Sequence, residues 1–118
     1  MTNHPNKAAI RRFFEEVWAN GNLSVIEEVY HRDFVDHDAN GPSIGTEALR
    51  QAIKTYRAEL PDLQFAIEDL LAQGDKVVTR WRARATRNGK PIDITGIRID
   101  RFENGKIAEE WENWDALG

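Results

Sequence analysis

Cysteine is absent from this chain of 118 residues, so disulfide bonds, thiolate nucleophiles and cysteine-bound metals are excluded. Long apolar runs are absent too: no segment approaches the ~20 residues of a membrane-spanning helix, and the N-terminal MTNHPNKAAI has no apolar signal region. The net charge of −4 argues against nucleic acid as a partner, because phosphate binding needs clustered positive charge. The sequence therefore predicts a cytoplasmic protein with neither a nucleic-acid nor a membrane partner.

The sequence gives little support for phosphate binding or for nucleophilic catalysis by serine. The loop GPSIG lacks the lysine and the spacing of a phosphate-binding loop. Ser24 and Ser43 fall in an expected helix cap and an expected turn, without the pattern of a nucleophile elbow. General acid–base catalysis by carboxylates and histidines remains, and no cofactor is implied.

Helical periodicity dominates the first half of the chain. After Pro5 the apolar positions recur at helical spacing on Ile10, Phe13, Phe14, Val17 and Trp18. Ser24 with Glu27 has the pattern of a capping box, which predicts a short second helix with a buried face of Val25, Ile26, Val29 and Tyr30. A third helix is expected over 46–60, ended by Pro61, with apolar positions at Leu49, Ala52, Ile53, Tyr56 and Leu60.

The second half has the period of two that marks β-strands. Strands are expected over 64–72, 76–86, 91–102 and 106–114, and a short one over 34–38 before a loop at 39–45. Asn88-Gly89 and Asn104-Gly105 are turn signals between them. Alternation in 76–86 separates one face, with Val77, Trp81, Ala83 and Ala85, from a face with Arg80, Arg82 and Arg84, and this arginine stripe is assigned no function.

Three helices followed by an antiparallel meander predict one α+β domain over residues 1–118, with the helices on one face of a bent sheet. A sheet wrapped around helices leaves a gap that can become a pocket for a small hydrophobic molecule. The pocket wall, or the core directly behind it, is expected to contain Phe14, Trp18, Tyr30, Phe34, Tyr56 and Trp81. The outer face of the sheet also needs cover, which predicts a symmetric homodimer.

Polar residues gather in two places, and the first is the segment with His31, Asp33, Asp36, His37 and Asp38. In an extended chain His37 faces away from the aspartates on either side of it, so convergence on a metal ion is disfavoured and no metal is predicted. His31 is expected to satisfy hydrogen bonds near the core, while Asp33 and Asp36 cap turns or face water.

The second place is the closing hairpin GIRIDRFENGKIAEEWENW, whose register is open. A three-residue loop ending at Gly105 would put Arg98 opposite Glu110, with Glu112 diagonal on the same face. A two-residue Asn-Gly turn would put Arg98 beside Trp111 instead. Facing inward, the arginine would hold the pKa values of both glutamates down; facing outward, the group would be a solvated ladder of little consequence.

Nearly the whole chain resembles the SnoaL-like polyketide cyclase group of the nuclear transport factor 2-like superfamily. The resemblance lies in the order of elements, in VYHRDFVDHD before a Gly-Pro loop, and in the closing GIRIDRFENGKIAEEWENWD. It implies a cone-shaped α+β barrel with a deep apolar pocket, commonly a homodimer packed through its sheet. It also favours the three-residue loop, because it needs positions 98 and 112 on one face.

The resemblance implies roles for single residues. The acidic general acid/base of the cyclases matches Glu112, and their pocket histidine matches Arg98, which is a departure. In the ketosteroid isomerase branch the base matches Asp38, but the two oxyanion-hole donors fall at Phe14 and Arg98, so neither survives. The Arg and two Asp of the limonene epoxide hydrolase branch fall at Thr79, Trp81 and Glu112. The superfamily hosts many activities, so the resemblance is stronger for fold than for reaction.

The leading hypothesis is a cofactor-independent enzyme of the cyclase or isomerase type that acts on a hydrophobic carbonyl compound. Glu112 would be the general acid/base, Arg98 the polarising cation and Asp38 the next candidate base. Glu110 is expected to engage Arg98 and leave Glu112 free, with His31, His37 and Asp38 at the pocket mouth. The alternative is a non-catalytic ligand-binding or dimerising module in which Arg98 and Glu112 neutralise each other.

Overall fold

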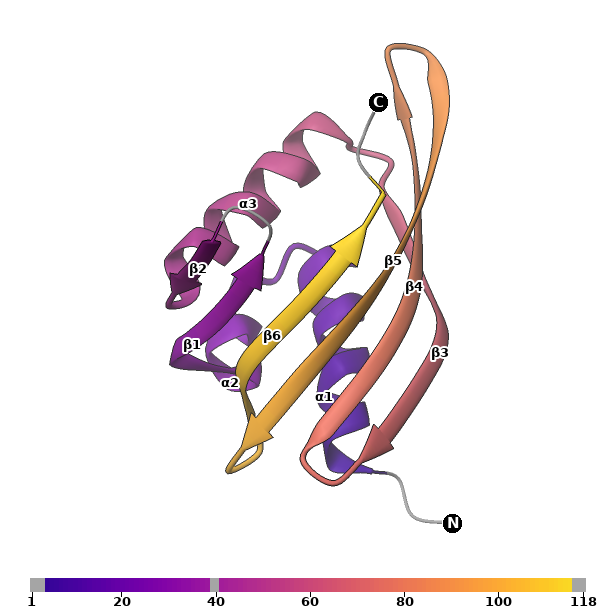
Figure 1. Ribbon diagram of the computed structural model, residues 1–118. Coiled ribbons are helices and arrows are strands. Elements are labelled where there is room, and N and C mark those ends of the chain that lie inside the picture. Colours follow the sequence, from indigo (N-terminus) through magenta and orange to yellow (C-terminus); the bar gives the residue numbers. More distant parts are fainter. Residues whose placement is uncertain (1–3, 39–40, 116–118) are drawn as a thin grey trace.

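The computed structural model describes residues 4–38 and 41–115, with Asp38 and Gly41 described by their backbone alone. It contains one six-stranded sheet with the helices on one side of it (Figure 1). The strand order is β2-β1-β6-β5-β4-β3, so β2 and β3 are the edges. The α+β class and the curved sheet are confirmed, whereas closure into a barrel is not.

The first helix begins as α1 (Pro5–Arg12) and continues as a π-helical segment, η1 (Phe13–Ala19). Proline suits the first turn of a helix because its missing N–H would be unpaired there, and the ring of His4 accepts a hydrogen bond from the Asn6 amide at 3.3 Å. The predicted apolar stripe is confirmed, because its members Ile10, Phe13, Phe14 and Val17 are buried. Gly21, at φ 72°, lets the chain leave the helix.

The second helical segment is shorter than the sequence predicts. It consists of a 3₁₀ turn, η2 (Leu23–Val25), and a single turn of α-helix, α2 (Ile26–Val29). The predicted capping box is wrong: Ser24 lies within the 3₁₀ turn and its hydroxyl donates to the side-chain oxygen of Asn22 at 2.7 Å. Tyr30, expected on this helix, is instead extended and opens the sheet.

The segment after α2 differs most from expectation. β1 (Tyr30–Asp38) has nine residues, and β2 (Gly41–Ile44) pairs back on it where a loop is predicted. β1 also pairs with β6 in the parallel sense, the one such pair among the described strands. β1 is therefore long because strands on both sides satisfy its backbone groups.

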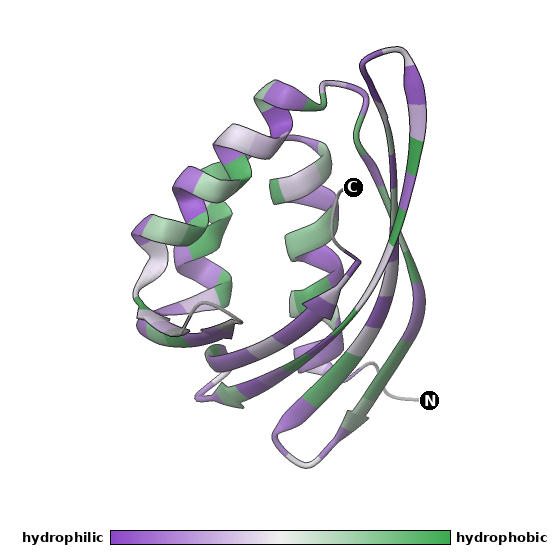
Figure 2. Cartoon of the chain, turned by 45° about the horizontal axis from the view of Figure 1, so that its top comes forward, coloured by the Kyte–Doolittle hydropathy of each residue, from purple (hydrophilic) through white to green (hydrophobic). Residues whose placement is uncertain are grey.

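Helix α3 (Thr46–Glu59) and the meander follow the predictions closely. The strands are β3 (Gln64–Gln73), β4 (Lys76–Arg87), β5 (Lys90–Glu103) and β6 (Lys106–Trp114). Apolar and polar residues alternate along them, which gives the banding in Figure 2. The predicted inward face of β4 is confirmed, since Val77, Trp81, Ala83 and Ala85 are buried.

The β4–β5 hairpin is longer than its neighbours. Its turn, Asn88-Gly89, has φ values of 52° and 76°, as a two-residue hairpin turn of twisted strands requires. β3 begins opposite Arg84 and β6 ends opposite Gly96, so the strands pair only with each other near the tip. The end of the hairpin projects beyond the sheet (Figure 1).

The β5–β6 hairpin corrects the favoured register. Asn104 and Gly105 form a two-residue turn, with φ values of 50° and 81°, and Glu103 lies opposite Lys106. The predicted three-residue loop is therefore wrong. A bulge at Ala108 then shifts the ladder by one residue, because Phe102 pairs with Ile107 but Arg101 pairs with Glu109.

The bulge decides which side chains meet on the inner face. It places Arg98 directly opposite Glu112 and Asp100 opposite Glu110. The expectation that positions 98 and 112 share a face is confirmed. Arg98 lies opposite neither predicted neighbour, because its partner Glu112 is two residues beyond Glu110 and one beyond Trp111.

Candidate functional site

Three rows of facing residues cross β4, β5 and β6 on the inner face of the sheet. They are Trp81–Gly96–Trp114, Thr79–Arg98–Glu112 and Val77–Asp100–Glu110. Polar residues are concentrated on β5 and β6, in a part of the fold where the surrounding helix residues are apolar. In the middle row Arg98 lies opposite Glu112, the carboxylate that the sequence singles out.

Arg98 is the centre of a buried polar group that we call the Arg98 cluster, made of Tyr30, Arg98, Asp100 and Glu110. Its guanidinium donates from Nε and Nη2 to the two carboxylate oxygens of Asp100, at 2.8 and 3.0 Å. Nη2 also donates to Glu110 and, at 2.6 Å, to the hydroxyl of Tyr30. That hydroxyl donates in turn to Glu110 at 2.7 Å. Every member is at most 3% exposed.

The Arg98 cluster contains two carboxyl groups and one cation. Burial raises the pKa of Asp100 well above its ordinary value, and the proximity of Glu110 acts in the same sense, against the attraction of Arg98. Burial disfavours the charged guanidinium, but Asp100 and Glu110 together hold the pKa of Arg98 well above its usual range. The ion pairs of the cation are thus made with Asp100 and Glu110.

Glu112 is partly buried beside this cluster. Burial raises the pKa of its carboxyl group to about 7; Arg98 lowers it, while Glu110 adds to the rise. The indole Nε1 of Trp81 donates a hydrogen bond to Glu112 at 2.8 Å. A carboxyl group with this pKa exchanges a proton readily near neutral pH, which is the property of a general acid/base.

Gly96 leaves the space that the Trp81 ring occupies. A Cβ built at Gly96 would lie 2.3 Å from a carbon of the indole, closer than any real contact. The indole therefore lies across the β5 backbone, and only glycine allows it to reach from β4 toward Glu112 on β6.

Aromatic rings lead away from Glu112 in what we call the aromatic arc, from the buried Trp81 through half-buried rings to Trp114, which is 43% exposed. It runs from Trp81 to Phe65, Trp18, Tyr56 and Trp114, with successive ring centroids 5.4, 4.9, 6.4 and 6.2 Å apart. Trp114 returns to β6, two residues beyond Glu112 on the same face. The arc thus continues the contact between Trp81 and Glu112 into a row of aromatic rings drawn from helix and sheet.

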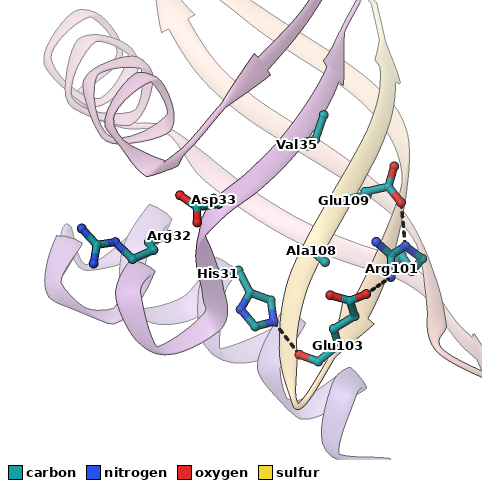
Figure 3. A pocket seen from close by; sticks show the side chains of 8 residues that line it. All are labelled: His31, Arg32, Asp33, Val35, Arg101, Glu103, Ala108 and Glu109. Carbon is teal, nitrogen blue, oxygen red and sulfur yellow. Dashed lines mark hydrogen bonds and ion pairs between the residues drawn. The ribbon is translucent and has the colours of Figure 1, made fainter.

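The two histidines singled out from the sequence lie elsewhere. His31 Nε2 is 2.7 Å from the Glu103 carbonyl oxygen, beside an open surface pocket of about 400 Å³ that also contacts Val35, Arg101 and Glu109 (Figure 3). His37 stacks on Trp111, with centroids 4.9 Å apart, and its Nε2 lies 2.9 Å from Glu109. Both are on the outer face of the sheet, so the fold does not bring them to Glu112.

This surface pocket has little that selects a ligand. Arg101 crosses it in ion pairs with Glu109 at 2.6 Å and Glu103 at 2.9 Å (Figure 3). The hydrogen bonds from His37 and Arg101 hold the pKa of Glu109 below its ordinary value. Arg101, Glu103 and Glu109 are therefore paired with each other, and the buried polar residues lie on the other face.

The remaining predicted residues fall in the core or outside the described part. Phe14, Tyr30, Phe34 and Trp81 are buried, and Trp18 and Tyr56 are partly buried. The side chain of Asp38 lies outside the described residues. In residues 4–38 and 41–115 no group of three or more acidic or histidine side chains could hold a metal ion, and no helix there is long and apolar enough to cross a membrane.

Sequence reasoning missed Asp100, Gly96 and the contributions of Phe65 and Trp114. Asp100 lies two residues after Arg98, so the period of a strand already places both on one face. That signal was available, because an aspartate at a buried strand position requires a cation or a donor. The role of Gly96 depends on where the Trp81 ring lies, and no sequence pattern gives this.

Comparisons with known proteins agree with this architecture. The family model of SnoaL-like polyketide cyclases matches residues 8–118. A candidate polyketide cyclase from Bacillus cereus ATCC 10987 is 36% identical, with a TM-score of 0.85 over 94% of this chain and 74% of that one. IdmH, a candidate polyketide cyclase from Streptomyces antibioticus, is 25% identical, with a TM-score of 0.84 over 95% and 93% of the two chains.

A third structure shows the fold alone. AclR from Streptomyces galilaeus, a candidate hydroxylase, is 21% identical, with a TM-score of 0.82 over 93% of this chain and 88% of that one. No curated protein matches the sequence. The family match and the likeness to IdmH support a protein with a pocket for a small molecule. Because the family model spans nearly all of the sequence and the fold agrees, the chain belongs to the SnoaL-like polyketide cyclase family.

Proposed function

We propose that this protein is a cofactor-independent enzyme of the cyclase or isomerase type, with Glu112 as general acid/base on an apolar carbonyl compound. The observation that carries the proposal is the position of Glu112, partly buried, with a pKa of about 7 and the aromatic arc beside it. Both protonation states are then populated near neutral pH, so the same group can accept and return a proton.

The state of Arg98 supports this role. An arginine bound directly to Glu112 would lower its pKa and make it a weak base. Here the ion pairs of Arg98 run to Asp100 and Glu110, and Glu112 accepts its hydrogen bond from the neutral indole of Trp81. Arg98 thus places a positive charge near Glu112 while its ion pairs are with the other two carboxylates.

The reaction needs no co-reactant. The Glu112 carboxylate takes a proton from the carbon next to a ketone, the C–H electron pair forms the carbon–carbon double bond of an enolate, and the carbonyl electron pair moves to oxygen. In a cyclase the enolate carbon then attacks a second carbonyl carbon of the same molecule, and Glu112 returns its proton to the new alkoxide. In an isomerase the proton returns to another carbon of the same molecule.

The second candidate is a ligand-binding protein without catalysis, which assembles as a dimer. Its support is the outer face of the sheet, where Leu71, Val78, Ile99 and Trp111 face each other in one apolar row across β3 to β6. Leu71 is 62% exposed, and the neighbouring Ile97 is 50% exposed. We propose that a second copy of the chain covers this face, and such a dimer is compatible with either candidate function.

Substitution of Glu112 by glutamine separates the two candidates. The reaction predicts that the protein exchanges the methyl protons of 2-acetylnaphthalene for deuterium in D₂O, measured by proton NMR. Glu112→Gln should abolish this exchange while retaining the fold, because the shape is unchanged. Glu59→Gln, at an exposed position of α3, is the matched control and should exchange as fast as the unsubstituted protein. Equal exchange by Glu112→Gln and the control would reject the proposed role.

A further inference from the structure

Thr79 has a hydroxyl group that the fold does not use. Its side chain is in the middle of β4 and 0% exposed, between Val77 and Trp81 on the inner face. Among the described residues its Oγ1 has no hydrogen-bond partner. A buried hydroxyl without a partner opposes folding, and valine would fill the same space without that cost.

The position of Thr79 connects it with the proposed reaction. Thr79 lies opposite Arg98, and Arg98 lies opposite Glu112, so the three share one row across the sheet. Facing side chains on adjacent strands have Cβ atoms about 5 Å apart. The hydrogen bonds that Arg98 makes to described residues leave from Nε and Nη2, toward Asp100, Glu110 and Tyr30.

We propose that Thr79 is the docking position for the carbonyl oxygen of the substrate. This inference rests on the proposed function and names the group that the substrate must present: a neutral oxygen acceptor on an apolar molecule. The Thr79 hydroxyl donates to that oxygen, and Arg98 in the same row places positive charge near it. The carbon next to the carbonyl then faces Glu112, and the negative charge that develops on oxygen as the proton leaves has a donor and a cation beside it.

Two substitutions of the same residue test the hydroxyl in the free protein. Thr79→Val removes the hydroxyl and keeps the branched shape, whereas Thr79→Ser keeps the hydroxyl and removes a methyl group. If the hydroxyl awaits a ligand, Thr79→Val should raise the urea midpoint of unfolding, and Thr79→Ser should lower it. A lower midpoint for Thr79→Val would mean that the hydroxyl already has a structural partner, and would overturn the proposal.

A matched pair of probes tests the docking itself. 2-Acetylnaphthalene and 2-ethylnaphthalene have the same ring system and differ mainly in the carbonyl oxygen. The unsubstituted protein should bind the ketone about tenfold more tightly than the hydrocarbon, measured by calorimetry, because one buried hydrogen bond is worth roughly that factor. Thr79→Ser should keep the preference and Thr79→Val should lose it. A Thr79→Val protein that keeps it, or an unsubstituted protein with no preference for the ketone, overturns the proposal.

The failure of this inference can be told apart from failure of the proposed function. If Thr79→Val abolishes the ketone preference while Glu112→Gln still exchanges protons, the docking position stands and the acid/base role of Glu112 falls. If Glu112→Gln abolishes exchange while Thr79→Val keeps the ketone preference, the reverse holds.

Discussion

The indole Nε1 of Trp81 donates a 2.8 Å hydrogen bond to Glu112, and its ring reaches that carboxyl group by lying across Gly96. Three strands are therefore joined at one point, with the donor on β4, the space on β5 and the acceptor on β6. The arrangement depends on the absence of a single methyl group at position 96.

Gly96→Ala should displace the Trp81 ring and break its hydrogen bond to Glu112. The added Cβ would lie 2.3 Å from the ring, and overpacking of this kind costs about 1 to 3 kcal/mol in the free energy of unfolding. The test is a double-mutant cycle by urea denaturation. In a Trp81→Phe background, where the smaller ring leaves room, Gly96→Ala should cost much less. Equal costs in the two backgrounds would contradict the packing that we describe.

The elevated pKa of Glu112 should make stability depend on pH in a defined window. The folded protein keeps a proton on Glu112 up to a pKa of about 7, whereas the unfolded chain releases it near 4.5. The contribution to stability is therefore complete below pH 4.5 and is lost as the pH rises toward 7. Relative to Glu112→Gln, the free energy of unfolding should fall by about 1 to 3 kcal/mol between pH 5 and 7.5. A difference independent of pH would show that Glu112 titrates normally.

Glu110→Gln should weaken the proposed catalysis without touching the substrate. The substitution removes a negative charge that raises the pKa of Glu112. It also removes one ion-pair partner of Arg98, which keeps Asp100 as its other partner and attracts the Glu112 carboxylate more strongly. Both changes lower the pKa of Glu112. The pH profile of deuterium exchange into 2-acetylnaphthalene should move to lower pH and its plateau should fall, because a weaker base removes the proton more slowly. Asp69→Asn, which breaks an exposed pair with Arg80 on the outer face, should leave the profile in place.

Ile99→Lys should separate the proposed dimer. Ile99 lies between Val78 and Trp111 in the apolar row of the outer face, so a buried lysine there would oppose association. Sedimentation velocity at micromolar concentration should give a mass near twice 13.5 kDa for the unsubstituted protein and near 13.5 kDa for Ile99→Lys. Ala58→Lys adds the same charge at an exposed position of α3 and should remain dimeric. A monomeric unsubstituted protein would reject the dimer.

The sequence predicts those parts of the fold that follow from periodicity. The stripe from Ile10 to Val17 and the alternation from Val77 to Ala85 are each a local pattern with one solution, and both are confirmed. The β5–β6 register is not local in this way. Relative to the three-residue loop, the two-residue turn and the bulge at Ala108 each shift the ladder by one residue in the same direction, and two such shifts keep every side chain on its face. Neither open register contains the bulge, yet Arg98 and Glu112 still share a face.

The sequence does not predict that β1 begins at Tyr30, and the reason is different. Tyr30 has apolar neighbours at helical spacing in Val25, Ile26 and Val29, so its sequence context favours a helix. In the structure its hydroxyl is needed by Glu110 and Arg98, on strands about 70 to 80 residues away. Such a contact is invisible to any local pattern.

The projecting end of the β4–β5 hairpin has a consequence for how the molecule opens. Beyond Arg84 on β4 and Gly96 on β5, these strands have mainly each other as ladder partners, and a two-stranded ribbon is marginally stable by itself. The Asp62 carboxylate accepts a hydrogen bond from the Thr86 amide at 3.0 Å, which holds the ribbon to the rest of the fold at that residue. Amide hydrogens between Thr86 and the tip should exchange with solvent rapidly, through local fraying. Those beside Arg98 and Glu112 should exchange only when the whole sheet opens. The tip can thus change length or sequence without a cost to the carboxyl group that the fold protects.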